Sequence, residues 1–241
     1  HSESQWIFFH DNDDWMHPET LQRLYDAAME LNAKISICGY EMTEGEDPEI
    51  VPEQLIPVAW TPKEYYLQHF VNATVCWGKL YHKTVFAGKR YPSGKYIEDE
   101  FLTYRLLFSQ EKLAVIHAPL YAYYINRAGI SKKAWVPKRL DAWEAYEQQL
   151  AYFKEMNDAE LISFRTREYL ENALKHYYAA EEAPNAAQLT KERKWMRRRI
   201  RRLIRECWHI GRIAFWSDFD FLIRFYPLLT RAYRLWHEWK H

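Results

Sequence analysis

The sequence predicts an α/β fold that is followed by an all-helical region. Two apolar runs, at residues 6–9 and 35–40, have the length and composition of short buried strands. Between them, His17-Pro18-Glu19 begins a helix, with proline at its tolerated first position. This order of strand, helix and strand is typical of α/β folds. After about Trp135 the spacing of the apolar residues becomes wholly helical.

The remaining elements follow in order along the chain. An acidic stretch that contains proline, at residues 44–57, is expected to be an irregular surface loop. Thr61-Pro62-Lys63-Glu64 is a capping box that opens a helix. The other expected elements are a helix after residues 96–100, strands at 113–116 and 120–125, and helices around 140–153 and 161–178.

The composition excludes several classes of protein. The 33 Lys and Arg residues balance the 33 Asp and Glu residues of this 241-residue chain, which argues against wholesale electrostatic capture by nucleic acid. Cys38, Cys76 and Cys207 are an odd and widely spaced set, so we expect neither a disulfide framework nor a zinc site. A reducing, cytoplasmic compartment fits this use of cysteine. No uninterrupted apolar run reaches the length of a membrane span.

Two acidic clusters could carry chemistry. Asp11-Asn12-Asp13-Asp14 directly follows the first apolar run, and carboxylates at the end of a strand can hold a divalent cation against phosphates. The simpler interpretation is a turn or helix cap, which Asp and Asn favour. Tyr96-Ile97-Glu98-Asp99-Glu100 precedes a helix, where its acids could either stabilise the helix dipole or remove a proton from an attacking hydroxyl.

A third segment, Val75-Cys76-Trp77-Gly78-Lys79-Leu80-Tyr81, lies between the acidic clusters. In one interpretation Trp77 and Leu80 belong to the core, Gly78 permits a turn and Lys79 is solvated. In the other, Trp77 or Lys79 lies beside a ligand.

Several motifs occur in one order along the first half of the chain, and together they are more specific than any one alone. They are Asp11-Asn12-Asp13 followed by Asp14-Trp15, then Gly78-Lys79-Leu80-Tyr81, Tyr96-Ile97-Glu98-Asp99-Glu100, Tyr121-Ala122-Tyr123-Tyr124 and Gly129-Ile130-Ser131. In this order the sequence resembles the second half of a family 2 glycosyltransferase of the GT-A fold, from the D-x-D motif onward.

The resemblance implies an inverting, metal-dependent transfer of a sugar from a nucleotide-diphosphate donor to a glycan or lipid-linked acceptor. Asp13, with Asp11 nearby, would hold Mg²⁺ or Mn²⁺ against the diphosphate of the donor. Asp99 would take the proton of the acceptor hydroxyl, and Glu98 and Glu100 would support it. For the third segment, Trp77 could stack on a sugar or belong to the core, and Lys79 could contact a phosphate or the acceptor.

The chain also departs from the family pattern. His10 stands where an apolar residue is usual, Asn12 replaces the common serine, and Gly129 replaces the first serine of the closing turn. The nucleotide-binding half that would precede the D-x-D motif is not in the sequence. We therefore expect a fragment or a truncated product, with little affinity for nucleotide sugars and no useful turnover on its own.

The late chain is strongly basic, since residues 191–205 contain nine Lys or Arg residues and one Glu. Apolar residues follow one face of the expected helix, a pattern that suits the anionic inner surface of a membrane. The alternative is a helical hairpin packed on the domain with a solvated basic face. Nucleic-acid binding is disfavoured because the cluster is confined to one helix.

The expected organisation has three parts: the acceptor-side half of a partial GT-A mixed sheet at residues 1–135, a helical hairpin at 136–183 and basic amphipathic helices at 184–241. The rival function is a non-catalytic membrane-surface or interaction module that keeps the fold. An unrelated phosphotransferase is disfavoured, because no phosphate-cradling glycine loop is present.

Overall fold

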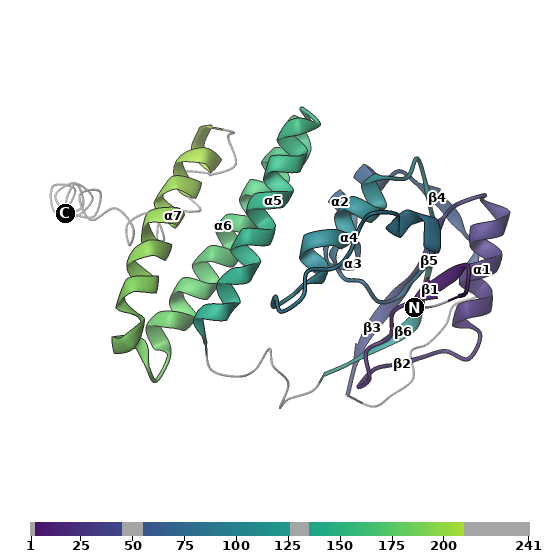
Figure 1. Cartoon of the computed structure of the whole chain (residues 1–241), viewed down its shortest axis with the longest axis horizontal. Coiled ribbons are helices and arrows are strands. Elements are labelled where there is room, and N and C mark those ends of the chain that lie inside the picture. The colour runs from purple at the N-terminus through teal and green to yellow at the C-terminus, as the bar shows by residue number, and fades with distance from the viewer. Residues whose placement is uncertain (1–2, 45–54, 126–134, 210–241) are drawn as a thin grey trace, which may run out of the picture. The chain divides into compact units, whose positions relative to one another are not determined.

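A computed structural model describes residues 3–44, 55–125 and 135–209 of the chain. The chain divides into two compact units, His1–Lys133 and Ala134–His241. We call them the α/β unit and the helical unit (Figure 1).

The α/β unit is built on a mixed sheet with the strand order β1-β5-β3-β6-β2, and β4 pairs with β6 beside this path. Among the strands that the structure describes, only β3 and β6 run parallel, and the other pairs are antiparallel. The sheet lies between helix α1 on one side and helices α2, α3 and α4 on the other (Figure 1). The strands are β1 Trp6–Phe8, β2 Trp15–Met16, β3 Ile35–Thr43, β4 Val58–Trp60, β5 Lys79–His82 and β6 Leu113–Tyr124. The helices are α1 Thr20–Glu30, α2 Pro62–Gln68, α3 Phe70–Thr74 and α4 Asp99–Phe108.

The expected strands at residues 113–116 and 120–125 form one long strand, β6, with an irregularity in its middle. The parallel register with β3 shifts between Cys38 and Tyr40, whose partners are Ile116 and Tyr121. Pro119 lies in the skipped stretch, where no ladder N–H is needed. Opposite it, Gly39 approaches β6 so closely that a Cβ there would lie 2.4 Å from the backbone oxygen of His117.

The core of the α/β unit joins residues from α1, β3, β5 and β6. Leu24 of α1, Cys38 of β3, Leu80 of β5 and Ile116 of β6 are all at most 6% exposed. The capping box at the start of α2 is confirmed, because the Glu64 N–H donates to Thr61 Oγ1 and the Thr61 N–H donates to Glu64 Oε2. Most of the expected loop at residues 44–57 lies outside the described residues.

Residues 135–209 of the helical unit form three long helices, α5 Asp141–Glu155, α6 Ala159–Glu182 and α7 Thr190–His209. Asp158 caps α6 by accepting hydrogen bonds from the N–H groups of Glu160 and Leu161. Trp143 of α5 stacks on Trp195 of α7, with ring centroids 5.2 Å apart. The predicted class, a mixed sheet followed by helices, is thus confirmed.

Two further findings concern the basic part of the chain. The apolar side chains of α7 are buried in the unit, so a packed helix with a solvated basic face is the interpretation that describes α7. Among the described helices, none is both long and apolar enough to traverse a bilayer. The basic residues beyond position 209 lie outside the described part of the chain.

Candidate active site

The acidic turn Asp11-Asn12-Asp13-Asp14 links β1 to β2, and a backbone hydrogen bond from the Asp14 N–H to the Asp11 oxygen closes it. Asp14 is 8% exposed. Its Oδ2 accepts a hydrogen bond from the Tyr121 hydroxyl at 2.7 Å, and its Oδ1 accepts one from the Tyr124 N–H at 2.9 Å. The Asp11 N–H donates in turn to the Tyr121 hydroxyl at 3.2 Å. The buried carboxylate therefore anchors the turn to β6.

The other two carboxylates of the turn, Asp11 and Asp13, are exposed. The pKa of Asp11 is raised, first by desolvation and then by the negative charges of Asp14 and Asp13, while His10 acts in the opposite direction. Carboxylates that repel one another in this way gain the most from a bound cation.

Asp99 is the first residue of α4 and is half-buried. Burial raises its pKa to about 7, and the charges of Glu100 and Glu98 act in the same direction. A carboxyl group with a pKa near neutrality can exchange a proton at physiological pH. Two residues earlier, Ile97 has a φ of 51°, a strained backbone conformation for a β-branched residue.

Cys76 lies between the two acidic motifs. Burial raises the pKa of its thiol to about 12, and the charges of Asp99, Asp11 and Glu98 add to this effect, while Lys79 opposes it. Glu98 likewise raises the pKa of Asp11. The charges of Asp11, Glu98 and Asp99 therefore all act on the Cys76 thiol, although these residues are far apart in the sequence.

Lys79 is fully buried, contrary to the expectation of a solvated side chain. Its Nζ donates to the Val75 oxygen at 2.8 Å, and to Asn72 Oδ1 and the Trp77 oxygen at 3.1 Å each. An ammonium group has three N–H donors, and these acceptors use all of them. The predicted contact with a phosphate or the acceptor therefore needs correction: Lys79 supports the site by holding the loop before β5. Burial lowers its pKa to about 7.

Trp77 is 6% exposed and belongs to the core. It stacks on Tyr121 with ring centroids 4.8 Å apart and an interplanar angle of 9°, and it also contacts Tyr123 and Tyr40. Of its two predicted roles, stacking on a sugar does not fit this burial. Because Tyr121 also holds the acidic turn, Trp77 supports that turn indirectly.

The donor set fits a hard divalent cation only in part. Within the described ranges, no three His, Cys, Asp or Glu side chains gather as a metal-binding group. Asp11 and Asp13 are exposed carboxylates two positions apart, whereas hydrogen bonds already engage both oxygens of Asp14. Mg²⁺ is commonly bound by one or two carboxylates together with phosphate and water oxygens. This pair of carboxylates is compatible with that arrangement.

Sequence reasoning missed three residues of the site: Asn72, Cys76 and Tyr121. Asn72 connects Lys79 to β3, since its Nδ2 donates to the Cys38 oxygen at 3.0 Å. Cys76 lies in the third segment that the sequence singles out, but its sequence context bears only on disulfide or zinc chemistry and indicates no place at the site. For Tyr121, the available signal was its place in a tyrosine-rich strand, which does not reveal a partner 107 residues away.

The chain is similar in sequence to two bacterial glycosyltransferases. The chain is similar to the putative glycosyltransferase EpsH of Bacillus subtilis (strain 168), with 26% identity over 166 residues, which cover 65% of this chain and 48% of that protein. It is also similar to the glycosyltransferase GlyA of Streptococcus pneumoniae serotype 4 (strain ATCC BAA-334 / TIGR4), with 23% identity over 190 residues, or 66% of this chain and 26% of that protein. The chain thus spans about half the length of EpsH and about a quarter of GlyA.

Among solved structures, the crystal structure of S. aureus TarS 1-349 matches with a TM-score of 0.49 and 14% identity, over 68% of this chain and 46% of that chain. The same protein in complex with UDP-GlcNAc matches with a TM-score of 0.47 and 13% identity, over 91% of this chain and 52% of that chain.

The model of glycosyl transferase family 2 matches residues 1–89. This stretch contains the acidic turn and the Gly78-Lys79-Leu80-Tyr81 segment, and it ends before Asp99. With the two glycosyltransferase relatives, this match makes the first part of the chain similar to glycosyl transferase family 2.

Proposed function

We propose that the site serves the transfer of a sugar from a nucleotide-diphosphate donor to a hydroxyl of a glycan or lipid-linked acceptor, with inversion, as in polysaccharide biosynthesis. The observation that carries the proposal is that the charges of two acidic motifs act on the Cys76 thiol, and that one of these motifs contains a carboxyl group with a pKa of about 7. The match of residues 1–89 to the model of glycosyl transferase family 2 supports the class of reaction.

In the proposed step, Asp99 removes the proton of the acceptor hydroxyl while its oxygen attacks the anomeric carbon of the donor. The new C–O bond forms as the bond from that carbon to the diphosphate oxygen breaks, and the diphosphate leaves with the electron pair. Attack from the face opposite the leaving group inverts the anomeric centre. Glu98 and Glu100 support this role, because their charges raise the pKa of Asp99.

Asp11 and Asp13 would hold Mg²⁺ or Mn²⁺, which when bound neutralises the charge that develops on the diphosphate. Tyr121 and Asp14 position the backbone of this turn through their hydrogen bonds. Lys79 and Trp77 act on the site through the loop and the strand that they pack against.

A transfer assay on the complete natural gene product tests the proposal, with a panel of nucleotide sugars and with Mg²⁺, Mn²⁺ or chelator. We expect Asp99→Asn to lower kcat about 10²–10⁴-fold, because this is the usual contribution of general base catalysis. Asp13→Ala should weaken the metal dependence, and Asp26→Asn, an exposed carboxylate on α1, is the control. Undiminished transfer by Asp99→Asn would reject its role, and no transfer by the wild type would favour the non-catalytic module.

The pH profile of kcat/KM tests the support role of Glu98. The rate should rise as Asp99 ionises, with a midpoint near pH 7. Glu98→Gln removes a charge that raises the pKa of Asp99, so the midpoint should move to lower pH. An unmoved midpoint would contradict this role.

Weak binding of nucleotide sugars by the 241-residue chain stays a prediction. Calorimetric titration of the chain with a uridine diphosphate sugar and Mn²⁺ measures it, and a micromolar Kd would show that the prediction is wrong. A peripheral position at the inner face of a membrane also stays a prediction, and α7 is the helix that could provide it.

A further inference from the structure

One side of α7 carries a row of exposed cations that we call the cationic stripe. Its residues are three or four positions apart, which places them on one face of the helix. The row covers 14 residue steps, or about 21 Å at the rise of an α-helix. The cationic stripe consists of Lys191, Lys194, Arg198, Arg202 and Arg205.

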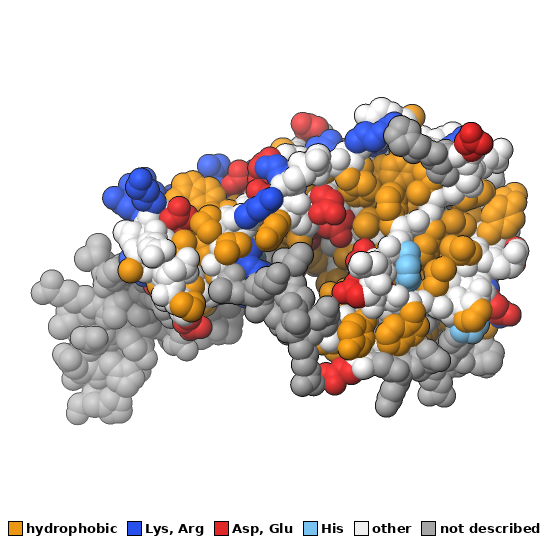
Figure 2. Space-filling model, turned by 60° about the horizontal axis from the view of Figure 1, so that its bottom comes forward, with side chains coloured by type: hydrophobic (Ala, Val, Ile, Leu, Met, Phe, Trp, Pro, Cys, Tyr) orange, Lys and Arg blue, Asp and Glu red, His pale blue; other side chains and the backbone are white. Residues whose placement is uncertain are grey.

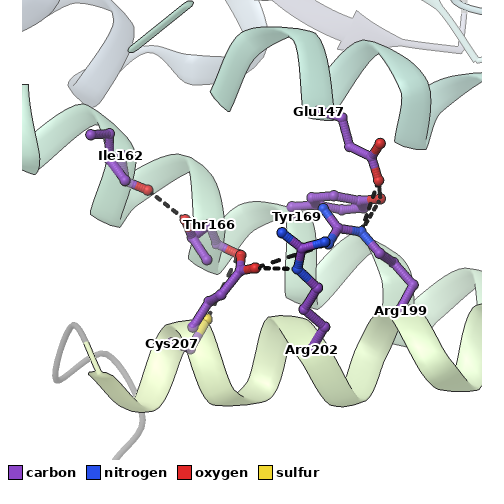
Figure 3. Close-up of polar contacts among 8 residues, drawn as sticks. Glu147, Ile162, Thr166, Tyr169, Arg199, Arg202 and Cys207 are labelled. Atoms are coloured by element: carbon purple, nitrogen blue, oxygen red, sulfur yellow. Dashed lines mark hydrogen bonds and ion pairs between the residues drawn. The ribbon is translucent and has the colours of Figure 1, made fainter. Parts of the chain in front are cut away.

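The opposite side of α7 is fixed in the core of the helical unit. Met196, Ile200, Leu203 and Ile204 are at most 3% exposed. Near the end of the helix, the Cys207 thiol donates to the Thr166 oxygen of α6 at 3.7 Å (Figure 3). The apolar face is therefore unavailable for insertion into a bilayer, and any partner of α7 must meet its charged side.

Two other cations of α7, Arg199 and Arg193, form ion pairs with carboxylates of neighbouring helices. Arg199 pairs with Glu147 of α5 at 2.8 Å and is 14% exposed (Figure 3). Arg193 pairs with Glu181 of α6 at 3.4 Å. Within the cationic stripe, Arg202 pairs with Glu206 but remains 64% exposed. The outer face of α7 thus keeps an excess of positive charge, and Figure 2 shows Lys and Arg side chains on the surface of the helical unit.

An exposed indole borders the cationic stripe. Trp195 is 46% exposed, although it stacks on Trp143. It also lines a hollow of about 330 Å³ together with Lys191, Leu140 and the carboxylate-bearing Glu192. Tryptophan is enriched at the level of lipid headgroups, where one end of the ring is dry and the other is wet.

We propose that the cationic stripe docks the helical unit on the surface of an anionic lipid bilayer. A straight row of cations fits a flat anionic surface, and Trp195 would lie at the headgroup level beside it. Nucleic acid also presents rows of phosphates. It is disfavoured because the chain has no net positive charge and because the stripe occupies a single helix. The inference goes beyond the proposed sugar transfer, and its readout does not depend on that activity.

Sedimentation with vesicles of phosphatidylcholine containing 30% phosphatidylglycerol tests the proposal, with pure phosphatidylcholine as the neutral surface. Each cation near an anionic surface contributes a factor of about five to binding. Neutralising four should therefore weaken binding about six-hundredfold at low salt, and raising the salt should weaken the binding of the wild type. The stripe variant carries Lys191→Gln, Lys194→Gln, Arg198→Gln and Arg205→Gln.

A matched control variant removes the same number of charges from exposed lysines elsewhere in the chain. It should bind anionic vesicles within about threefold of the wild type, because these lysines lie off the stripe. Circular dichroism and the Tm should agree among the three proteins, since all eight side chains are exposed. The control variant carries Lys34→Gln, Lys83→Gln, Lys112→Gln and Lys154→Gln.

Loss of vesicle binding in the stripe variant alone supports the proposal. Equal binding by the stripe and control variants overturns it, as does equal binding of the wild type to neutral and anionic vesicles. Tighter binding of the wild type to a 20-base-pair DNA duplex than to anionic vesicles, in the same buffer at 0.15 M salt, also overturns it in favour of a nucleic-acid partner.

Discussion

In the α/β unit, charged side chains lie inside the fold: Lys79 is fully buried, and Asp14 is only 8% exposed. In the helical unit, α7 keeps most of its charge outside, and Arg202 is 64% exposed although it forms an ion pair. The partners differ as well. Asp14 depends on a tyrosine 107 residues away, whereas Arg202 pairs with a residue four positions along its own helix.

This difference shows where each unit is sensitive. A buried charge depends on every one of its partners, because removing one leaves a group that water cannot reach. A surface pair loses little when it is broken, since water replaces the missing partner. We therefore expect charge substitutions to have large effects near the site of the α/β unit and small effects at the exposed positions of α7.

The largest effect is expected for Asp14→Ala. This change leaves the Tyr121 hydroxyl and the Tyr124 N–H without their acceptor, and it should lower the free energy of unfolding by about 3 kcal/mol. Urea unfolding measures the loss, and hydrogen exchange of the β6 amides assigns it to the α/β unit.

The neighbouring carboxylate provides the control. Asp13 is exposed, so Asp13→Ala should change the free energy of unfolding by less than about 0.5 kcal/mol. Equal losses in the two variants would show that the hydrogen bonds of Asp14 do not stabilise the unit.

The second largest effect is expected for Asp99→Asn, and it is a gain of stability, not a loss. The pKa of Asp99 rises from 3.8 to about 7 on folding, so the protonated group stabilises the fold below about pH 4, and this contribution is lost as the pH rises to 7. Asp99→Asn removes the buried charge and should stabilise the protein by about 2 kcal/mol at pH 8. At pH 4 the gain should vanish. Urea unfolding at the two pH values measures it.

Asp141 offers a matched control, because it is the first residue of α5 as Asp99 is of α4. Asp141→Asn weakens an interaction with the helix dipole and should destabilise the helical unit by about 0.5 kcal/mol at pH 8. A gain of stability in both variants would mean that the Asp99 effect is not specific to its buried position.

The fold could be predicted from sequence where one element carries its own signal. The capping box at Thr61 is read from four consecutive residues and is confirmed. The strands β2 and β4, with two and three residues, were missed because they are too short for an alternating pattern. Their pairing with β6 defines them, and single-sequence reasoning cannot see that pairing.

The same limit applies to the site. Asp11, Asp13 and Asp99 were identified from motifs, and the charges of Asp11 and Asp99 both raise the pKa of the Cys76 thiol. The burial of Lys79 was not foreseen, because a lysine is ordinarily solvated and nothing local indicates three acceptors around it. Similarly, the place of Tyr121 follows from the parallel pairing of β6 with β3.

The third effect compares the loss of one hydroxyl at Tyr121 in the α/β unit with the same loss at Tyr169 in the helical unit. Tyr121→Phe keeps the stack on Trp77 but removes the hydroxyl that Asp14 and the Asp11 N–H share, so we expect a loss of about 1.5 kcal/mol by urea unfolding. Tyr169→Phe in the helical unit should cost about 0.5 kcal/mol, because Arg199 still pairs directly with Glu147 (Figure 3).

The affinity for Mn²⁺ tests whether Tyr121 also positions the acidic turn. If Tyr121 positions the acidic turn, Tyr121→Phe should weaken the binding of Mn²⁺, while Tyr123→Phe, which also alters a ring packed on Trp77, should not. Identical Mn²⁺ affinities for Tyr121→Phe and the wild type would limit Tyr121 to a role in stability.

The smallest effect is expected for Arg202→Gln, because its pair with Glu206 is exposed and four residues apart. Such pairs contribute about 0.3–0.5 kcal/mol, and 0.5 M NaCl should remove most of this contribution. Arg199→Gln, at a side chain that is 14% exposed and bonded to Glu147 and Tyr169, should cost about 1–2 kcal/mol and depend less on salt. Urea unfolding at 0.05 and 0.5 M NaCl measures both. If Arg202→Gln lowers the free energy of unfolding as much as Arg199→Gln does, then the exposure of a side chain on α7 does not decide how much its charge contributes to stability. The difference between the two units would then have another cause.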